Sequence, residues 1–113
     1  MKKTCEFVSP KHPDKICDLI ADSILDAYLE NDKESRTAIE VMGGHNLITI
    51  NGEVTSKDNP DIEKLVKEIV GQNYKIIINI VLQSPEIARG VDKGGAGDQG
   101  ILKAYATDET PDY

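Results

Sequence analysis

Apolar residues recur every three to four positions between residues 13 and 31, a spacing that predicts an amphipathic helix. The apolar positions are Ile16, Leu19 or Ile20, Ile24, and Ala27 or Tyr28, and the acids Asp18, Asp22, Asp26 and Glu30 fall between them. Pro13 suits the first helical position, and Asp14 would place a carboxylate at the positive end of the helix dipole. We therefore expect a helix over residues 13–31.

Apolar and polar residues alternate with a period of two between residues 36 and 54, which predicts a β-hairpin. Its strands are expected at 36–42 and 47–54, joined by a turn over residues 43–46. Period two places Ala38, Glu40 and Met42 on one face of the first strand. Thr37, Ile39 and Val41 then share the other face.

A second helix is predicted after residue 59, with Asn59 as N-cap, Pro60 at the first helical position and Gly71 just past the end. Its apolar stripe comprises Ile62, Leu65, Val66 and Ile69. The run 74–82 is almost continuously apolar, so it predicts a strand buried on both faces. Residues 83–100 are rich in glycine and predict a loop.

These elements predict an α+β domain over residues 1–113, a two-layer α/β sandwich with helices packed on one face of a mixed sheet. A short strand around residues 4–7 would complete the order β-α-β-β-α-β. The other sheet face would have no cover, which implies a partner chain or further polypeptide. A homodimer through this open face is our expectation.

The formal net charge of −7 argues against binding to nucleic acid or to an anionic membrane. With no run of 18 apolar residues and no apolar leader after Met1, we expect a soluble, cytoplasmic protein. Cys5 and Cys17 form no CxxC motif and match no zinc-ligand spacing, so we interpret both as reduced structural thiols.

Three sets of residues could carry chemistry. Residues 95–100, GAGDQG, match GxGxxG, but the strand and helix that a dinucleotide site needs do not flank them. His12, Asp14 and Lys15 at a helix start suit a Mg²⁺-polyphosphate, although Asp14 could simply complement the helix dipole and His12 could be a cap.

The third set consists of Glu40, Glu53 and Gln83. Glu40 could hold a cation and Glu53 a substrate ammonium group, although a glutamate on a sheet face is more often simply solvated. Gln83 directly follows a strand, where α/β sites often place specificity residues, but it could be an ordinary loop glutamine.

Several motifs in order resemble the S-adenosylmethionine synthetase (methionine adenosyltransferase) family. They are the HPDK run His12 to Lys15 within residues 8–18, Ala38 to Glu40, Asn51 to Glu53, residues 83–87 (QSPEI), 90–92, 95–100 (GAGDQG) and 105–110. The similarity spans nearly the whole chain but corresponds to the N-terminal part of the family's longer chain.

The resemblance implies a transferase that makes S-adenosylmethionine from ATP and L-methionine, with Mg²⁺ and K⁺ as cofactors. It implies that His12 and Lys15 are catalytic and ATP-binding residues, that Asp14 binds Mg²⁺ and that Glu40 binds K⁺. Glu53, Gln83 and Asp98 would bind methionine, and residues 83–93 would gate the site.

The chain also departs from the family pattern. Ser9-Pro10-Lys11 replaces the usual small, acidic and glycine lead into HPDK, the gate segment is short, and the family's second Mg²⁺ aspartate and later phosphate-binding residues have no counterpart. We therefore expect the 113 residues alone to be inactive. The alternative function is a catalytically inactive dimerisation or ligand-binding module that needs another chain.

Overall fold

The computed structural model describes residues 1–2, 4, 6–83, 100–101, 104, 106 and 108. The chain divides into two units, Met1–Gln83 and Ser84–Tyr113. The first unit carries the helices and strands α1 (Pro13–Asn31), β1 (Arg36–Gly44), β2 (Leu47–Thr55), α2 (Ile62–Val70) and β3 (Lys75–Leu82). Of the expected strand at residues 4–7, the described residues Thr4, Glu6 and Phe7 lie in no strand, so that prediction is wrong for them.

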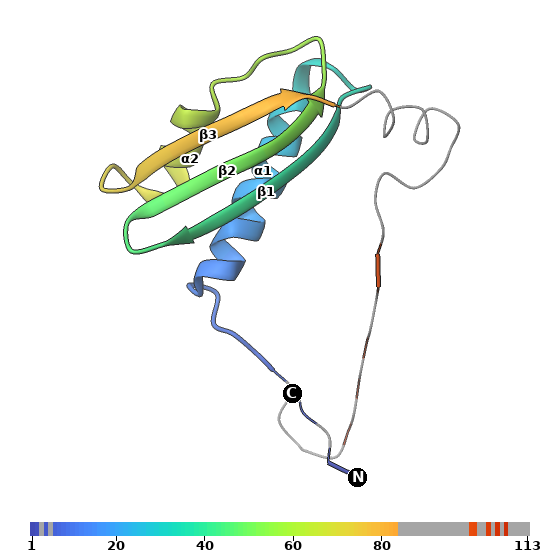
Figure 1. The fold of residues 1–113 in the computed structure, drawn as a ribbon, viewed down its shortest axis with the longest axis vertical. Coiled ribbons are helices and arrows are strands. Elements are labelled where there is room, and N and C mark those ends of the chain that lie inside the picture. Colours follow the sequence, from blue (N-terminus) through green and yellow to red (C-terminus); the bar gives the residue numbers. More distant parts are fainter. Residues whose placement is uncertain are drawn as a thin grey trace. The chain divides into compact units, whose positions relative to one another are not determined.

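The predicted α+β sandwich with one covered sheet face is confirmed. The three strands lie in the order β1-β2-β3, with β1 and β2 antiparallel and β2 and β3 parallel, so the sheet is mixed. Both helices lie on one side of this sheet (Figure 1). Within residues 6–83, no helix or strand covers the opposite side.

The core lies between the helices and the sheet. Its fully buried side chains come from α1, β2 and α2, namely Ile20, Ile24, Ile48, Ile50 and Val66. The buried side of α1 repeats every three to four residues, as the sequence predicts, with Cys17, Ile20, Ile24 and Tyr28. Burial of these aliphatic side chains is the main stabilising contribution in a chain with few aromatic residues.

The hairpin loop is shorter than the predicted turn. Gly43 and Gly44 belong to β1, and only His45 and Asn46 connect the strands, with φ angles of 49° and 62°. Positive φ at both central residues defines the turn type whose twist matches that of the flanking strands. The two-residue loop fixes the register, in which Glu40 pairs with Asn51 and Ala38 with Glu53.

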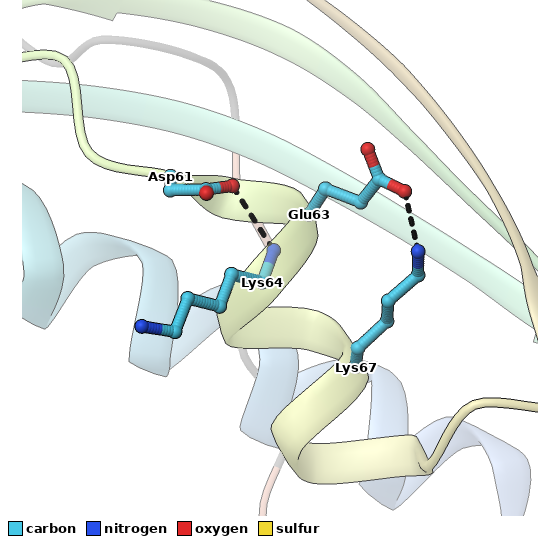
Figure 2. Close-up of polar contacts among 4 residues, drawn as sticks. All are labelled: Asp61, Glu63, Lys64 and Lys67. Carbon is cyan, nitrogen blue, oxygen red and sulfur yellow. Dashed lines mark hydrogen bonds and ion pairs between the residues drawn. The ribbon is translucent and has the colours of Figure 1, made fainter.

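The start of α2 corrects the sequence prediction. Asp61, not Asn59, is the N-cap, because its Oδ1 accepts a hydrogen bond from Lys64 N at 3.1 Å (Figure 2). Pro60 therefore precedes the helix. The predicted end is confirmed, since Gly71 caps the helix with a φ of 87°. On the exposed side of α2, Lys67 Nζ lies 2.6 Å from Glu63 Oε1.

The expectation that the strand at 74–82 is buried on both faces is wrong for the described part of the chain. Ile77 is 43% exposed and Val81 52% exposed, because their side chains lie on the uncovered face of β3. Ile76 and Ile80 point to the opposite face and pack against the core. A continuous apolar run gives no information on which of the two faces is covered.

A polar cluster ties the end of α1 to the end of β2. Asp32 Oδ2 accepts a hydrogen bond from Lys57 N at 2.8 Å, and Asp32 Oδ1 accepts one from Glu34 N at 3.1 Å. These backbone donors, with that of Lys57 the stronger influence, hold the pKa of Asp32 below its ordinary value. The buried Ser35 hydroxyl lies 2.7 Å from Ser56 Oγ and donates to Tyr28 O at 3.3 Å.

Candidate functional site

The first group of predicted site residues surrounds the start of α1. His12 is the N-cap, and its Nδ1 accepts a hydrogen bond from Asp14 N at 3.1 Å. In a neutral imidazole, a ring whose Nδ1 accepts carries its proton on Nε2, which can donate to a ligand. Asp14 Oδ2 lies 3.8 Å from the same Nδ1, and the Asp14 side chain is 84% exposed. His12 can therefore cap the helix through Nδ1 and bind a ligand through Nε2 at the same time.

Lys15 occupies the next position of α1 and is exposed. Its Nζ lies 5.2 Å from the centroid of the Phe7 ring, a distance at which a cation is attracted to an aromatic face. Phe7 is itself 86% exposed. The start of α1 therefore presents an imidazole N–H, a carboxylate and an ammonium group to solvent, together with helix N–H groups that favour anions.

This end of α1 packs against the loop end of the hairpin. A small cavity of about 70 Å³ lies between them, lined by Lys11, Pro13, Ile16, Cys17, Gly43, Gly44, Ile48 and Tyr74. Burial raises the pKa of the Cys17 thiol, and the nearby Asp14 and Asp18 raise it further. Cys17 is a free thiol held in its neutral form, as the structural interpretation expects. Cys5 lies outside the described residues.

The second group of predicted site residues shares the uncovered face of the sheet. Glu40 lies on this face of β1 and is exposed, and Glu53 lies on it in β2 and is half-buried. Gln83 directly follows β3, two residues after Val81, which is the register partner of Glu53. Gln83 N donates to Val54 O at 3.1 Å, so the parallel ladder continues to this residue. Strand pairing thus brings two acids and an amide to one face.

Three further polar residues on this face were not predicted. Asn79 Nδ2 donates to Asn51 Oδ1 at 2.7 Å, in the row that also contains Glu40. Thr55 Oγ1 donates to Gln83 Oε1 at 3.2 Å. The period of two could have placed Asn51 and Thr55 beside Glu53. Asn79 could be placed only once the pairing of β2 with β3 was known.

The two groups do not meet within residues 6–83. His12, Asp14 and Lys15 belong to the helix layer, whereas Glu53 and Gln83 occupy the uncovered side of the sheet near the end opposite the hairpin loop. Asp98, most of the predicted gate at 83–93 and most of residues 95–100 lie outside the described residues.

The described site residues supply only some of the ligands that a bound metal ion would need. Among the described residues, no three His, Cys, Asp or Glu side chains gather into a metal-binding group. Asp14 nevertheless fits Mg²⁺, which commonly takes one or two carboxylates from protein and other oxygens from phosphate and water. Glu40 offers a carboxylate in the same row as the amide oxygens of Asn51 and Asn79, and oxygen donors of this kind fit K⁺.

A cavity among the described residues lies elsewhere. It measures about 530 Å³ and is bounded by the helix side of β3 and the segment before α2, with a lining that includes Tyr28, Val54, Asp58, Ile62, Ile80 and Leu82. None of the predicted site residues lines it, so the polar uncovered face is the better candidate. Within the same residues, no helix is long and apolar enough to cross a membrane.

The fold and the candidate site define a two-layer α+β domain that displays polar side chains on an uncovered mixed sheet. A family model described as S-adenosylmethionine synthetase, N-terminal domain, matches residues 1–88. The chain belongs to the S-adenosylmethionine synthetase family and carries its N-terminal domain. The predicted resemblance is thereby confirmed.

A solved structure supports the same assignment. It is described as an unusual S-adenosylmethionine synthetase from Campylobacter jejuni, and this chain is similar to it with a TM-score of 0.64 and 33% sequence identity. The similarity covers 69% of this chain and 26% of that chain. The chain therefore spans about a quarter of the length of the synthetase that it matches.

Proposed function

We propose that this chain contributes the methionine-binding face and the nucleotide-binding helix start of a methionine adenosyltransferase. The observation that carries the proposal is that Glu53 and Gln83 lie on one uncovered sheet face, in a chain of the S-adenosylmethionine synthetase family. A carboxylate complements the ammonium group of an amino acid, and amide N–H groups complement its carboxylate. Asp98 is proposed as a further methionine-binding residue.

In the proposed reaction, the thioether sulfur of L-methionine attacks C5′ of ATP. The C5′–O bond breaks, and its electron pair leaves with the tripolyphosphate, which water then cleaves to phosphate and pyrophosphate. The substrate supplies the nucleophile, so the protein has to align sulfur, C5′ and the leaving oxygen and to stabilise the negative charge that develops. Glu53 would bind the ammonium group of methionine, and Gln83 would bind its carboxylate.

The start of α1 is proposed to receive the polyphosphate. His12 can donate from Nε2 toward the leaving oxygen, and Lys15 adds a positive charge one turn away from the capping residue. When bound, Mg²⁺ would neutralise phosphate charge, with Asp14 as its protein ligand, and Glu40 would hold K⁺. Because His12 and Gln83 lie in different layers of one domain, a complete site needs a second surface.

A second copy of the chain is the proposed partner of the uncovered sheet face. The uncovered face carries exposed apolar side chains beside its polar row, including Met42 at 71%, Ile77 at 43% and Val81 at 52% exposure. An apolar face of this kind favours pairing of sheets, and a twofold pairing would place polar rows from two copies together. We expect the chain alone to form no S-adenosylmethionine, since it matches only 26% of the Campylobacter jejuni synthetase chain.

The proposal is tested by titrating the ¹⁵N-labelled chain with L-methionine. We expect chemical-shift changes at Glu53, Thr55 and Gln83, and we expect Glu53→Gln to weaken binding by about tenfold or more, because the ammonium group loses a charged partner. Glu63→Gln is the matched control, since it makes the same chemical change on the exposed side of α2 (Figure 2). Equal effects of the two variants, or no shifts on β2, would overturn the proposal.

A further inference from the structure

The end of β2 and the residue after β3 are joined by a side-chain hydrogen bond. Thr55 Oγ1 donates to Gln83 Oε1 at 3.2 Å, and both residues are half-buried. The backbone holds the same two segments together, because Gln83 N donates to Val54 O at 3.1 Å. The position of Gln83 is therefore fixed at its main chain by the sheet and at its amide by Thr55.

The direction of this hydrogen bond determines what Gln83 can offer to a ligand. A glutamine amide has one carbonyl oxygen, which accepts, and one NH₂ group, which donates twice. Since Thr55 uses the carbonyl oxygen, the donating NH₂ group is left to meet an acceptor. Thr55 suits this task because its β-branched side chain has restricted χ1 freedom. A free glutamine could present either end of its amide.

We propose that Thr55 is a positioning residue that orients the Gln83 amide to present its N–H groups to the carboxylate of an amino-acid ligand. This inference rests on the proposed function, in which Gln83 and Glu53 bind methionine. Thr55 lies two residues after Glu53 on the same face of β2. It selects for an anionic group at Gln83 and disfavours a ligand that would donate a hydrogen bond there.

The first test needs no ligand. ¹⁵N relaxation of the Gln83 side-chain NH₂ group reports its order in the free chain. We expect restricted motion in the wild type and in Thr55→Ser, which keeps the hydroxyl, and faster motion in Thr55→Val, which keeps the branched shape but cannot donate. Thr49→Val is the control, because Thr49 is a half-buried threonine on the same face of β2. Equal order in the wild type and Thr55→Val would overturn the inference.

The second test uses L-methionine and L-methioninol, which carries a hydroxymethyl group in place of the carboxylate. Thr55→Val should weaken L-methionine binding by roughly three- to tenfold, the range expected for one net hydrogen bond, and should leave L-methioninol binding nearly unchanged. The ratio of the affinity for L-methionine to the affinity for L-methioninol should then fall by the same factor. Thr55→Ser should keep the wild-type affinity ratio, and so should Thr49→Val.

Comparison with Gln83→Ala separates this inference from the proposed function. If Gln83→Ala weakens L-methionine binding and Thr55→Val does not, the positioning role of Thr55 is overturned and the proposed function stands. If Gln83→Ala leaves L-methionine binding unchanged, the proposed role of Gln83 fails, and the role of Thr55 toward this ligand fails with it.

Discussion

Asn79 donates its side-chain amide to Asn51 Oδ1 at 2.7 Å, across the boundary between β3 and β2 on the uncovered face. Along β3, Asn79 separates Ile77 from Val81, both of which are exposed. Asparagine is disfavoured in strands, so intrinsic propensity does not explain its presence here. The amide pair interrupts what would otherwise be a continuous apolar stripe on an unpaired face.

Asn79→Val should increase self-association of the chain. The substitution removes one exposed hydrogen bond but adds apolar surface and strand propensity, so the free energy of unfolding should change by less than about 1 kcal/mol. Sedimentation velocity across a concentration series measures the association. Asn79→Asp, which keeps the face polar, should not associate more than the wild type. A monomeric Asn79→Val protein at every concentration would contradict the prediction.

Gly52→Ala should destabilise the fold by about 1–3 kcal/mol or more, because a Cβ at this position would overlap the backbone of β1 at Ala38 O and approach Ile39 Cα to 2.9 Å. Backbone atoms of a paired strand cannot move aside as a flexible side chain can. Urea denaturation gives the loss. Gly44→Ala is the matched control, since Gly44 has the same φ of 159° as Gly52 but nothing within 4 Å of the added carbon.

His12→Ala should lower the free energy of unfolding by about 0.5–2 kcal/mol, because the Asp14 N–H loses its capping acceptor. His12→Asn should restore most of this stability, since asparagine is among the best N-cap residues. Thermal and urea unfolding of the two variants measure the difference. Equal stability of His12→Ala and the wild type would show that the cap observed at His12 does not stabilise α1.

Asp14→Asn separates a dipole role from a metal role. Loss of the charge in the first turn should cost about 0.3–1 kcal/mol of stability. If Asp14 is a Mg²⁺ ligand, the same variant should also weaken the Mg²⁺ dependence of ATP binding, measured by titration of a fluorescent ATP analogue at several Mg²⁺ concentrations. Unchanged Mg²⁺ dependence would leave Asp14 with the helix-dipole role alone.

Asp32 should make stability depend on pH in the acidic range. Its pKa is lowered in the folded chain, mainly by the Lys57 N–H and next by the Glu34 N–H, so the folded state favours the carboxylate. The stabilising contribution is complete above the unfolded pKa of about 3.9 and is lost as the pH falls through the lower folded value. Urea unfolding between pH 7 and pH 2 should show the stability of Asp32→Asn and the wild type converging in acid. A stability difference between Asp32→Asn and the wild type that stays constant down to pH 2 would contradict the prediction.

Local sequence signals predicted the helices more accurately than they predicted which sheet faces are buried. The period of α1 and Pro13 predicted its full extent, because both act within a few residues. The start of α2 was misplaced since Asn59 and Asp61 flank Pro60 and both can cap, and only the bond from Lys64 N distinguishes them. The exposure of β3 depends on which layers are present, and an apolar run such as Lys75–Leu82 gives no information on that.

The candidate site was predictable residue by residue but not as an arrangement. The alternation of β1 gave the face of Glu40, whereas the face shared with Glu53 required the hairpin register. Gln83 joined them through the parallel pairing of β3 with β2, a contact between distant segments. The hydrogen bond of Thr55 to Gln83 depends on that same pairing, so inspection of either strand alone would have missed it.

The two-residue loop of His45 and Asn46 also determines which side chains of β1 and β2 lie on the same face of the sheet. Glu40 and Glu53 share a face only because an even number of residues separates the last pair of β1 and β2, Gly44 and Leu47. Insertion or deletion of one residue would either create a bulge or turn every side chain of one strand to the opposite layer, carrying a carboxylate into the core. Length variation at this loop among related chains should therefore occur in steps of two unless a bulge accompanies it, although the loop itself touches no proposed ligand.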